Sequence, residues 1–118
     1  MANYRNPLAR LFYASFYSIR GLYFAAQQEQ AFRYETFVLF ALCFVLWTVR
    51  LRLTQALILV GAWLLVIAFE LVNSAVERTF DLIDTSFRPE IQAGKDMLSA
   101  AVFLMVCFNI ALWGIMFA

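Results

Sequence analysis

A run of thirteen apolar residues, 57–69, leads without a break into a segment that carries several carboxylates. Neither Pro nor Gly occurs between Ala62 and Asp84, so a single helix can carry both parts. Successive residues of a helix advance by about 100°, which places the polar residues of the second part in one stripe roughly 80° wide. The members of this polar stripe are Glu70, Asn73, Glu77, Asp81 and Asp84. Such a helix begins in hydrocarbon and ends in water.

The first members of the polar stripe require more explanation than the last. A carboxylate at mid-bilayer costs about 2.5–3.5 kcal/mol on insertion scales, and membrane proteins keep such groups mainly for function. Asp81 and Asp84 are adequately explained as polar residues at the cytoplasmic end of a membrane helix. Glu70 and Asn73 follow the apolar run directly, and they favour a functional site.

The composition is that of a membrane protein. Hydrophobic residues make up 64% of the chain and the mean hydropathy is +0.77, whereas soluble domains contain about 45–50% apolar residues. The net charge of +1 provides no basic surface for nucleic acid. The chain lacks His, so a bound metal is expected to be a hard ion such as Mg²⁺ on carboxylate oxygens. Cys43 and Cys107 lie in apolar stretches and are predicted to be small core residues without a disulfide.

The hydrophobic pattern predicts an all-α membrane protein that forms a single domain over residues 1–118. An N-terminal amphipathic helix at the membrane interface precedes three membrane spans. The predicted ranges are about 8–28 for the interfacial helix and about 31–49, 54–84 and 92–118 for the spans, the second of which includes a cytoplasmic extension. Asn109, isolated in the third span, is expected to hydrogen-bond to a neighbouring helix.

Apolar residues of the interfacial helix recur every three or four positions, which is typical of a helix that lies in the membrane surface. They are Leu8, Leu11, Phe12, Phe16, Ile19 and Tyr23. Arg10 and Arg20 lie outside this apolar face. Both are consistent with anchors to lipid headgroups, and both are also consistent with contacts to phosphates.

The distribution of Lys and Arg predicts the orientation of the chain, because cytoplasmic segments carry the excess. Seven cations lie in the N-terminal segment and the second loop, namely Arg5, Arg10, Arg20, Arg33, Arg78, Arg88 and Lys95. The first loop carries two, Arg50 and Arg52. The N-terminus and the second loop are therefore expected on the cytoplasmic side, where ATP is available.

Several residues on that side suit phosphoryl transfer. Glu29 and Glu77, from different helices, can hold Mg²⁺ while nucleotide phosphates complete its shell. Lys95 and Arg10 can neutralise phosphate charge. Glu70, nearer the apolar phase, can accept a proton from a lipid hydroxyl. The segment around Lys95 lacks the upstream Gly and the following Ser or Thr of a Walker A loop, so nucleotide would bind without one.

Three blocks of the sequence resemble the small bacterial integral-membrane diacylglycerol kinases of the Gram-negative type. The blocks are Glu29-x-Ala31-Phe32-Arg33-x-Glu35, then Glu70-x-x-Asn73-Ser74-Ala75-Val76-Glu77-x-x-x-Asp81, and Lys95-Asp96-x-x-Ser99-Ala100-Ala101-Val102. The extended N-terminal helix with Arg10, Tyr17 and Gly21 is also similar to that family. The resemblance covers nearly all of the chain.

The resemblance implies a homotrimeric bundle in the bacterial inner membrane, with three active sites that are each shared between subunits. Its activity would be the ATP-dependent phosphorylation of diacylglycerol to phosphatidic acid with Mg²⁺. Polar groups on the second span also favour a homotrimer, since they would otherwise face hydrocarbon.

The resemblance also implies roles for individual residues. Glu70 would be the catalytic base, and Glu29 and Glu77 would bind the metal and the ATP phosphates. Nucleotide would further contact Arg10, Tyr17, Lys95 and Asp96, with Arg88 added on its charge alone. The lipid substrate would meet Arg10, Ala31, Phe32, Arg33, Glu35, Glu70, Ser99 and Trp113. Asn73 and Asp81 would support the site.

Two other functions stay open at this point. Gram-positive relatives share the central block, so undecaprenol is an alternative lipid substrate. A non-catalytic membrane assembly subunit is the second alternative. The sequence also departs from the family: Gly94 replaces a usual Ala before the Lys-Asp pair, and the loop 86–89 differs.

Overall fold

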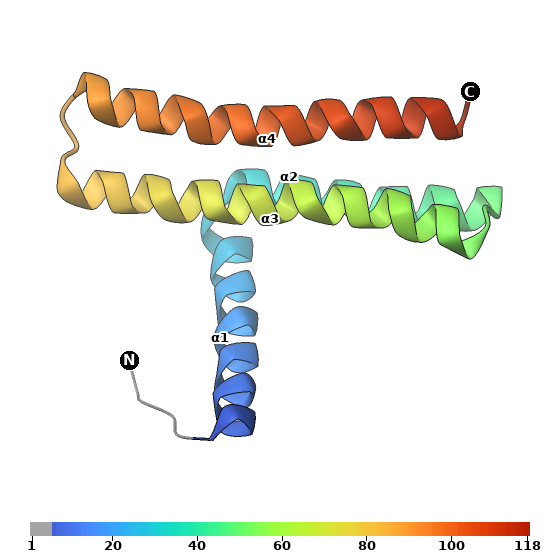
Figure 1. Cartoon of the computed structure of the whole chain (residues 1–118), viewed down its shortest axis with the longest axis horizontal. Coiled ribbons are helices and arrows are strands. Elements are labelled where there is room, and N and C mark those ends of the chain that lie inside the picture. The colour runs from blue at the N-terminus through green and yellow to red at the C-terminus, as the bar shows by residue number, and fades with distance from the viewer. Residues whose placement is uncertain (1–5) are drawn as a thin grey trace.

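The computed structural model describes residues 6–118, which form four α-helices and their connections (Figure 1). The helices are α1 (Pro7–Gln28), α2 (Gln30–Val49), α3 (Leu53–Ile83) and α4 (Pro89–Met116). The last three are long and apolar enough to cross a membrane, which confirms the predicted all-α chain with three candidate spans. Arg5, one of the cations in the charge count, lies outside the described residues.

The chain bends sharply at Glu29, which we call the elbow. Glu29 has extended backbone angles (φ −114°, ψ 110°) and separates α1 from α2 by a single residue. The guanidinium of Arg33 donates hydrogen bonds to the carbonyl oxygens of Ala26 (3.3 Å) and Gln27 (3.0 Å). These carbonyls belong to the last turn of α1, where they have no partner within the helix. Arg33 therefore stabilises the bend without Pro or Gly.

Helix α3 is the centre of the arrangement. Both α2 and α4 pack along it, whereas α1 leaves the elbow crosswise to the other three helices (Figure 1). The two fully buried large side chains, Leu59 and Val66, both belong to α3. A small core of Ala25, Phe32 and Ile67 holds the elbow against α3.

Beyond this core α3 continues past the elbow. The stretch from Leu71, which packs at the edge of the core, to the end of the helix at Ile83 rises by about 18 Å. In Figure 1 this part of α3 and the start of α4 extend past the point where α1 and α2 meet. The second half of the polar stripe therefore lies outside the layer formed by the elbow.

Most of the apolar surface of the spans faces outward. Only seven hydrophobic side chains are buried among residues 6–118, while large ones such as Phe37, Trp47 and Ile110 are about 70% exposed or more. Hydrocarbon or neighbouring chains can cover such surfaces. Cys43 and Cys107 are free, as predicted, but both are exposed, so their predicted place in the core was wrong. The outward face of a membrane helix is as apolar as its core, so hydropathy does not separate the two.

Asn109 joins α4 to α3 within the apolar layer. Its side chain is buried, and its Nδ2 donates to the carbonyl oxygens of Ala62 (2.9 Å) on α3 and Met105 (2.8 Å) on α4. This confirms the predicted hydrogen bond to a neighbouring helix. Bonds of this kind contribute roughly 0.6–2 kcal/mol in membranes.

The turn between α3 and α4 is organised by Asp84. Its carboxylate accepts hydrogen bonds from the backbone N–H (2.8 Å) and the hydroxyl (2.6 Å) of Ser86, and from Arg88 Nε (2.6 Å). The hydroxyl of Ser86, then its N–H, then Arg88 hold the pKa of Asp84 below its ordinary value of 3.8. These bonds are therefore complete at neutral pH and are lost only as the pH falls through that lowered pKa.

Gly94 permits a close approach of α4 to α3. A Cβ atom at this position would lie 2.7 Å from Cζ and 3.1 Å from Cε2 of Phe80. Such distances are too short for carbon atoms, so the ring of Phe80 occupies the space that a methyl group would need. Glycine at position 94 therefore fits beside the ring of Phe80.

We predict that Gly94→Ala destabilises the protein by about 1 kcal/mol, because the strain against Phe80 exceeds the helical advantage of Ala. The measurement is the midpoint of thermal unfolding in detergent, followed by circular dichroism. Gly114→Ala is the matched control, since no atom lies within 4 Å of the added Cβ there. Adding Phe80→Leu to Gly94→Ala should restore the midpoint. An unfolding midpoint of Gly94→Ala at or above that of Gly114→Ala would contradict the prediction.

Candidate functional site

Four carboxylates from three segments gather where the elbow meets α3. Glu70 on α3 lies within electrostatic range of Glu77, two turns further along the same helical face, of Glu29 at the elbow and of Glu35 on α2. We call these four residues the carboxylate cluster. Glu70 is buried, with 8% of its surface exposed, while the other three are partly exposed. Chain folding thus unites the predicted base, both predicted metal ligands and one predicted lipid contact.

Mutual repulsion makes the cluster a site for positive charge. Like charges within electrostatic range of one another destabilise the charged forms, so a cation or a proton is favoured there. Asn73 lies one turn from Glu70 on α3, so its side chain is a neighbour of the Glu70 carboxylate. Asn73 Oδ1 is buried and has no hydrogen-bond partner among the described residues. The supporting role expected of Asn73 stays a prediction.

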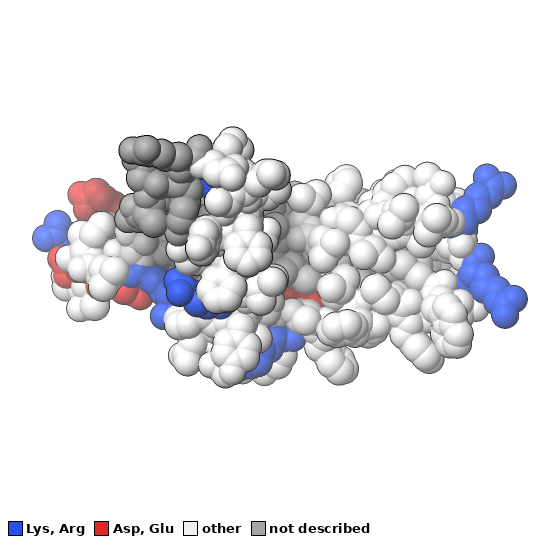
Figure 2. Space-filling model, turned by 90° about the horizontal axis from the view of Figure 1, so that it is seen from below, with Lys and Arg blue, Asp and Glu red and all other residues white. Residues whose placement is uncertain are grey.

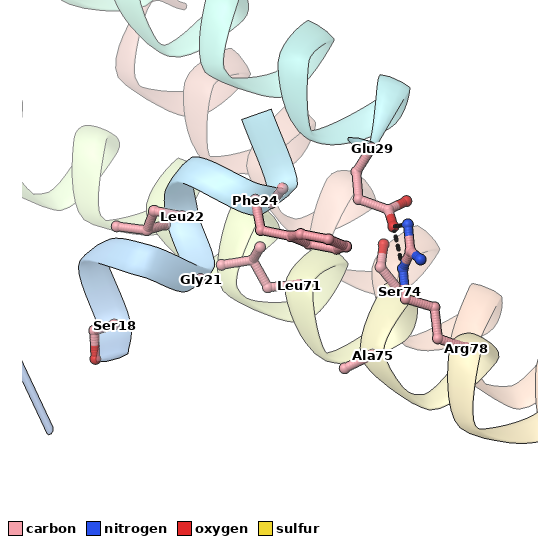
Figure 3. A pocket seen from close by; sticks show the side chains of 10 residues that line it. Ser18, Gly21, Leu22, Phe24, Glu29, Leu71, Ser74, Ala75 and Arg78 are labelled. Carbon is pink, nitrogen blue, oxygen red and sulfur yellow. Dashed lines mark hydrogen bonds and ion pairs between the residues drawn. The ribbon is translucent and has the colours of Figure 1, made fainter. Parts of the chain in front are cut away.

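Arg78 provides the positive charge that the structure places beside the cluster. Its Nε (2.7 Å) and terminal nitrogen (2.6 Å) both approach Oε1 of Glu29. The guanidinium carbon lies 4.9 Å from the ring centroid of Phe24 on α1. Figure 3 shows Glu29 and Arg78 at one end of a hollow of about 480 Å³ between α1 and α3, next to Ser74.

The sequence pattern placed Arg78 among the cytoplasmic cations but assigned it no role in the site. A signal was present, since Arg78 is the only Lys or Arg between Glu70 and Asp84. Its position directly after Glu77 places it about 100° around the helix, toward α1 instead of into the polar stripe. That α1 would pass this face of α3 could not be seen from the spacing.

The predicted nucleotide contacts on the α3–α4 side are already paired with neighbours. Lys95 Nζ contacts Asp81 Oδ1 at 2.9 Å and so joins α4 to α3. Asp96 accepts a hydrogen bond from Gln92, one turn earlier on α4. Arg88 is bound to Asp84 in the turn. Phosphates that reach Lys95 or Arg88 must therefore compete with carboxylates.

Two predicted nucleotide contacts lie apart from the carboxylate cluster of their own chain. Arg10 is exposed in the first turns of α1, about 28 Å along the helix axis from Glu29. Tyr17, also exposed, has the guanidinium of Arg20 over its ring at 5.3 Å. Since α1 leads away from the other helices (Figure 1), Arg10 cannot reach the Glu29 of the same chain.

The predicted lipid contacts are also spread out. Phe32 is buried in the core at the elbow, Arg33 caps α1, and Ala31 is exposed beside them. Ser99 is exposed on α4, and Trp113 lies near the opposite end of that helix, stacked on Phe117 at 5.7 Å. Of this group, Glu35 and Glu70 are the members in the carboxylate cluster.

The charged side chains on the molecular surface are unevenly distributed along the long axis. Figure 2 shows acidic side chains, together with Lys and Arg, toward one end of the long axis and near its middle, while the charged side chains at the far end of that face are all Lys or Arg. Arg50 and Arg52, in the turn between α2 and α3, belong to the end opposite Asp84. A cation arriving from solution is therefore attracted to the cluster end.

The donor set fits Mg²⁺ only when phosphates take part. Within residues 6–118 no group of three or more His, Cys, Asp or Glu side chains forms a ready-made metal site. Glu29, Glu77 and the unpaired Asn73 Oδ1 offer hard oxygen ligands. Mg²⁺ commonly binds through one or two carboxylates together with substrate phosphates, which agrees with this set.

Comparisons with known proteins cover nearly the whole chain. The sequence model of the family described as "Prokaryotic diacylglycerol kinase" matches residues 16–117. The chain is similar to the diacylglycerol kinase of Haemophilus influenzae, with 36% identity over 110 residues, which is 91% of each protein. It is similar to that of Helicobacter pylori, with 37% identity over 107 residues, 89% of this chain and 82% of the relative. The diacylglycerol kinase of Escherichia coli K12 shares 34% over 117 residues, 98% of this chain and 95% of the relative.

Proposed function

The chain belongs to the prokaryotic diacylglycerol kinase family, and on that premise we propose that it transfers the γ-phosphate of ATP to diacylglycerol, with Mg²⁺, to give phosphatidic acid. Family membership makes the protein a membrane-bound lipid kinase. The observation that supports the specific reaction is the carboxylate cluster, which lies where the apolar part of α3 gives way to its polar extension. A lipid hydroxyl and a nucleotide phosphate can meet at such a boundary.

In this proposal Glu70 acts on the lipid. Its carboxylate, buried and next to Asn73, takes the proton of the lipid hydroxyl as the oxygen attacks the γ-phosphorus. The bond from the γ-phosphorus to the bridging oxygen breaks, and ADP leaves. Burial keeps bulk water away from Glu70, which disfavours hydrolysis of ATP.

Glu29 and Glu77 would hold the nucleotide through Mg²⁺, which when bound neutralises charge on the transferred phosphoryl group. They come from the elbow and from the polar extension of α3, so they approach from the aqueous side of Glu70. Lys95 and Asp96 on α4 would complete the nucleotide site, once phosphate displaces Asp81 from Lys95.

We propose that the protein is a homotrimer whose active sites are shared between subunits. Arg10 and Tyr17 lie far from the carboxylate cluster of their own chain, so the N-terminal half of α1 would have to serve the cluster of a neighbour. Buried polar atoms without partners among residues 6–118, such as Asn109 Oδ1 and Trp113 Nε1, also favour contacts with other chains. The crosswise course of α1 fits a helix in the cytoplasmic surface of the inner membrane, with the N-terminus cytoplasmic.

Chemical crosslinking in mild detergent should give a trimer as the largest abundant species, with activity retained. The reason is that an isolated chain exposes most of its large apolar side chains and holds Arg10 and Tyr17 away from its own carboxylate cluster. A crosslinked sample that contains only monomer at full activity would contradict the shared site.

The choice of lipid is tested with purified protein, ATP and Mg²⁺ supplied with each lipid in turn. We expect diacylglycerol to be phosphorylated, with radiolabelled phosphate appearing in phosphatidic acid. Phosphorylation of undecaprenol but not diacylglycerol would replace the proposed substrate. Absence of ATP turnover with both lipids, together with tolerance of the Glu70→Gln substitution, would indicate a non-catalytic assembly subunit.

Glu70→Gln and Glu77→Gln should fail in different ways, because the two residues are separated by about 10.5 Å along α3. Glu70→Gln should lower kcat by about 10²–10⁴ while nucleotide binding is largely kept. Glu77→Gln should weaken the apparent affinity for Mg²⁺-ATP as well as lower turnover. Binding and turnover are measured on both variants in one detergent. Glu90→Gln, on the first turn of α4, is the matched control and should behave as the unmodified protein. Loss of nucleotide binding in Glu70→Gln alone would show that the two roles are reversed.

A further inference from the structure

Arg78 is bound to a residue that the proposed metal site also needs. Both of its contacting nitrogens converge on one oxygen, Oε1 of Glu29. Within the described residues it is the only cation in an ion pair with the carboxylate cluster, since the other two pairs join Lys95 to Asp81 and Arg88 to Asp84. The Glu29 contact therefore places Arg78 directly beside the proposed ligands.

Arg78 can leave Glu29 and still be held by its contact with the ring of Phe24. Its side chain is 49% exposed, and that of Glu29 is 22% exposed. Pairs this open to water are weak, at about 0–1 kcal/mol. The ring of Phe24 holds the guanidinium independently, at 4.9 Å, and the hollow between α1 and α3 adjoins it (Figure 3). A small change at Glu29 can thus redirect the guanidinium within the same pocket.

Binding of a divalent cation would supply that change. A guanidinium and a dication on one carboxylate repel each other, so a metal ion that binds Glu29 favours the departure of Arg78. The nearest new anion would be the phosphate that arrives with the metal. Guanidinium groups bind phosphate oxygens through paired N–H donors, and a group already held against an aromatic ring loses little freedom in doing so.

We propose that Arg78 is a positioning residue that exchanges partners during the reaction cycle. It holds Glu29 against α3 when the site is empty, and it moves to a phosphate oxygen of the nucleotide when metal occupies Glu29. This inference rests on the proposed function, because it takes Glu29 as a ligand of the metal–nucleotide complex. The alternative is that Arg78 keeps its ion pair with Glu29 throughout the cycle and only connects the elbow to α3.

The two views predict different effects of Arg78→Gln. Exchange of partners predicts opposite changes of two affinities in Arg78→Gln. Mn²⁺ added without nucleotide should bind about threefold more tightly, because a competing cation is gone. Mg²⁺-ATP should bind about tenfold more weakly, because a phosphate contact is gone. Electron paramagnetic resonance of free Mn²⁺ measures the first affinity, and equilibrium binding of a fluorescent ATP analogue measures the second. Arg78→Lys, which keeps the charge but not the paired donors, should lie between Arg78→Gln and the unmodified protein in both.

Arg52→Gln is the matched control, because Arg52 is an exposed arginine at the other end of α3. Neither affinity should change in that variant. A parallel fall of both affinities in Arg78→Gln, or no change in either, would overturn the exchange and leave the proposed lipid kinase reaction standing. If the unmodified protein binds neither Mn²⁺ nor nucleotide, the proposed function and the exchange both fail. Arg78→Lys gives the same comparison if Arg78→Gln does not fold.

Discussion

Repulsion among four carboxylates at the edge of hydrocarbon is the constraint on which the rest of the structure depends. Glu70 is buried beside Glu29, Glu35 and Glu77, and an isolated membrane helix would have to neutralise it. Within the cluster, Asn73 lies next to Glu70 on α3, and Arg78 pairs with Glu29 on the side that faces α1. Further along α3 and outside the cluster, Asp81 pairs with Lys95 of α4.

The elbow gives this cluster its geometry. One extended residue, Glu29, lies between two helices, and Arg33 satisfies the carbonyl oxygens that the bend exposes. The small core of Ala25, Phe32 and Ile67 then presses the elbow against α3 at the level of Glu70. The carboxylate of Glu29 is thereby carried on a rigid corner instead of a flexible loop. A fixed position of Glu29 suits the proposed metal–phosphate site, since small misplacements cost much of the rate.

Few of the apolar side chains are used inside the chain itself. The close contacts of α3 with its neighbours depend on specific features: Asn109 bonded to the carbonyl of Ala62, Gly94 facing the ring of Phe80, and Trp63 donating to the carbonyl of Glu35 at 2.8 Å. Exposed Phe, Leu and Ile side chains cover the remaining faces. Helix association in lipid depends on such close packing and polar bonds, because burial in another helix is no more favourable than burial in lipid.

The sequence by itself determined the helices and the polar stripe. Absence of Pro and Gly from Ala62 to Asp84 predicted the continuous α3, and the 3.6-residue period placed Glu70, Asn73 and Glu77 on one side of it. It also predicted the interhelical bond of Asn109. Which helix faces meet was decided only by the tertiary structure, because periodicity orients residues around one axis and says nothing about the neighbouring axes. For that reason the ion pair of Arg78 with Glu29, the exposure of Cys43 and Cys107, and the separation of Arg10 from Glu29 could not be predicted from spacing.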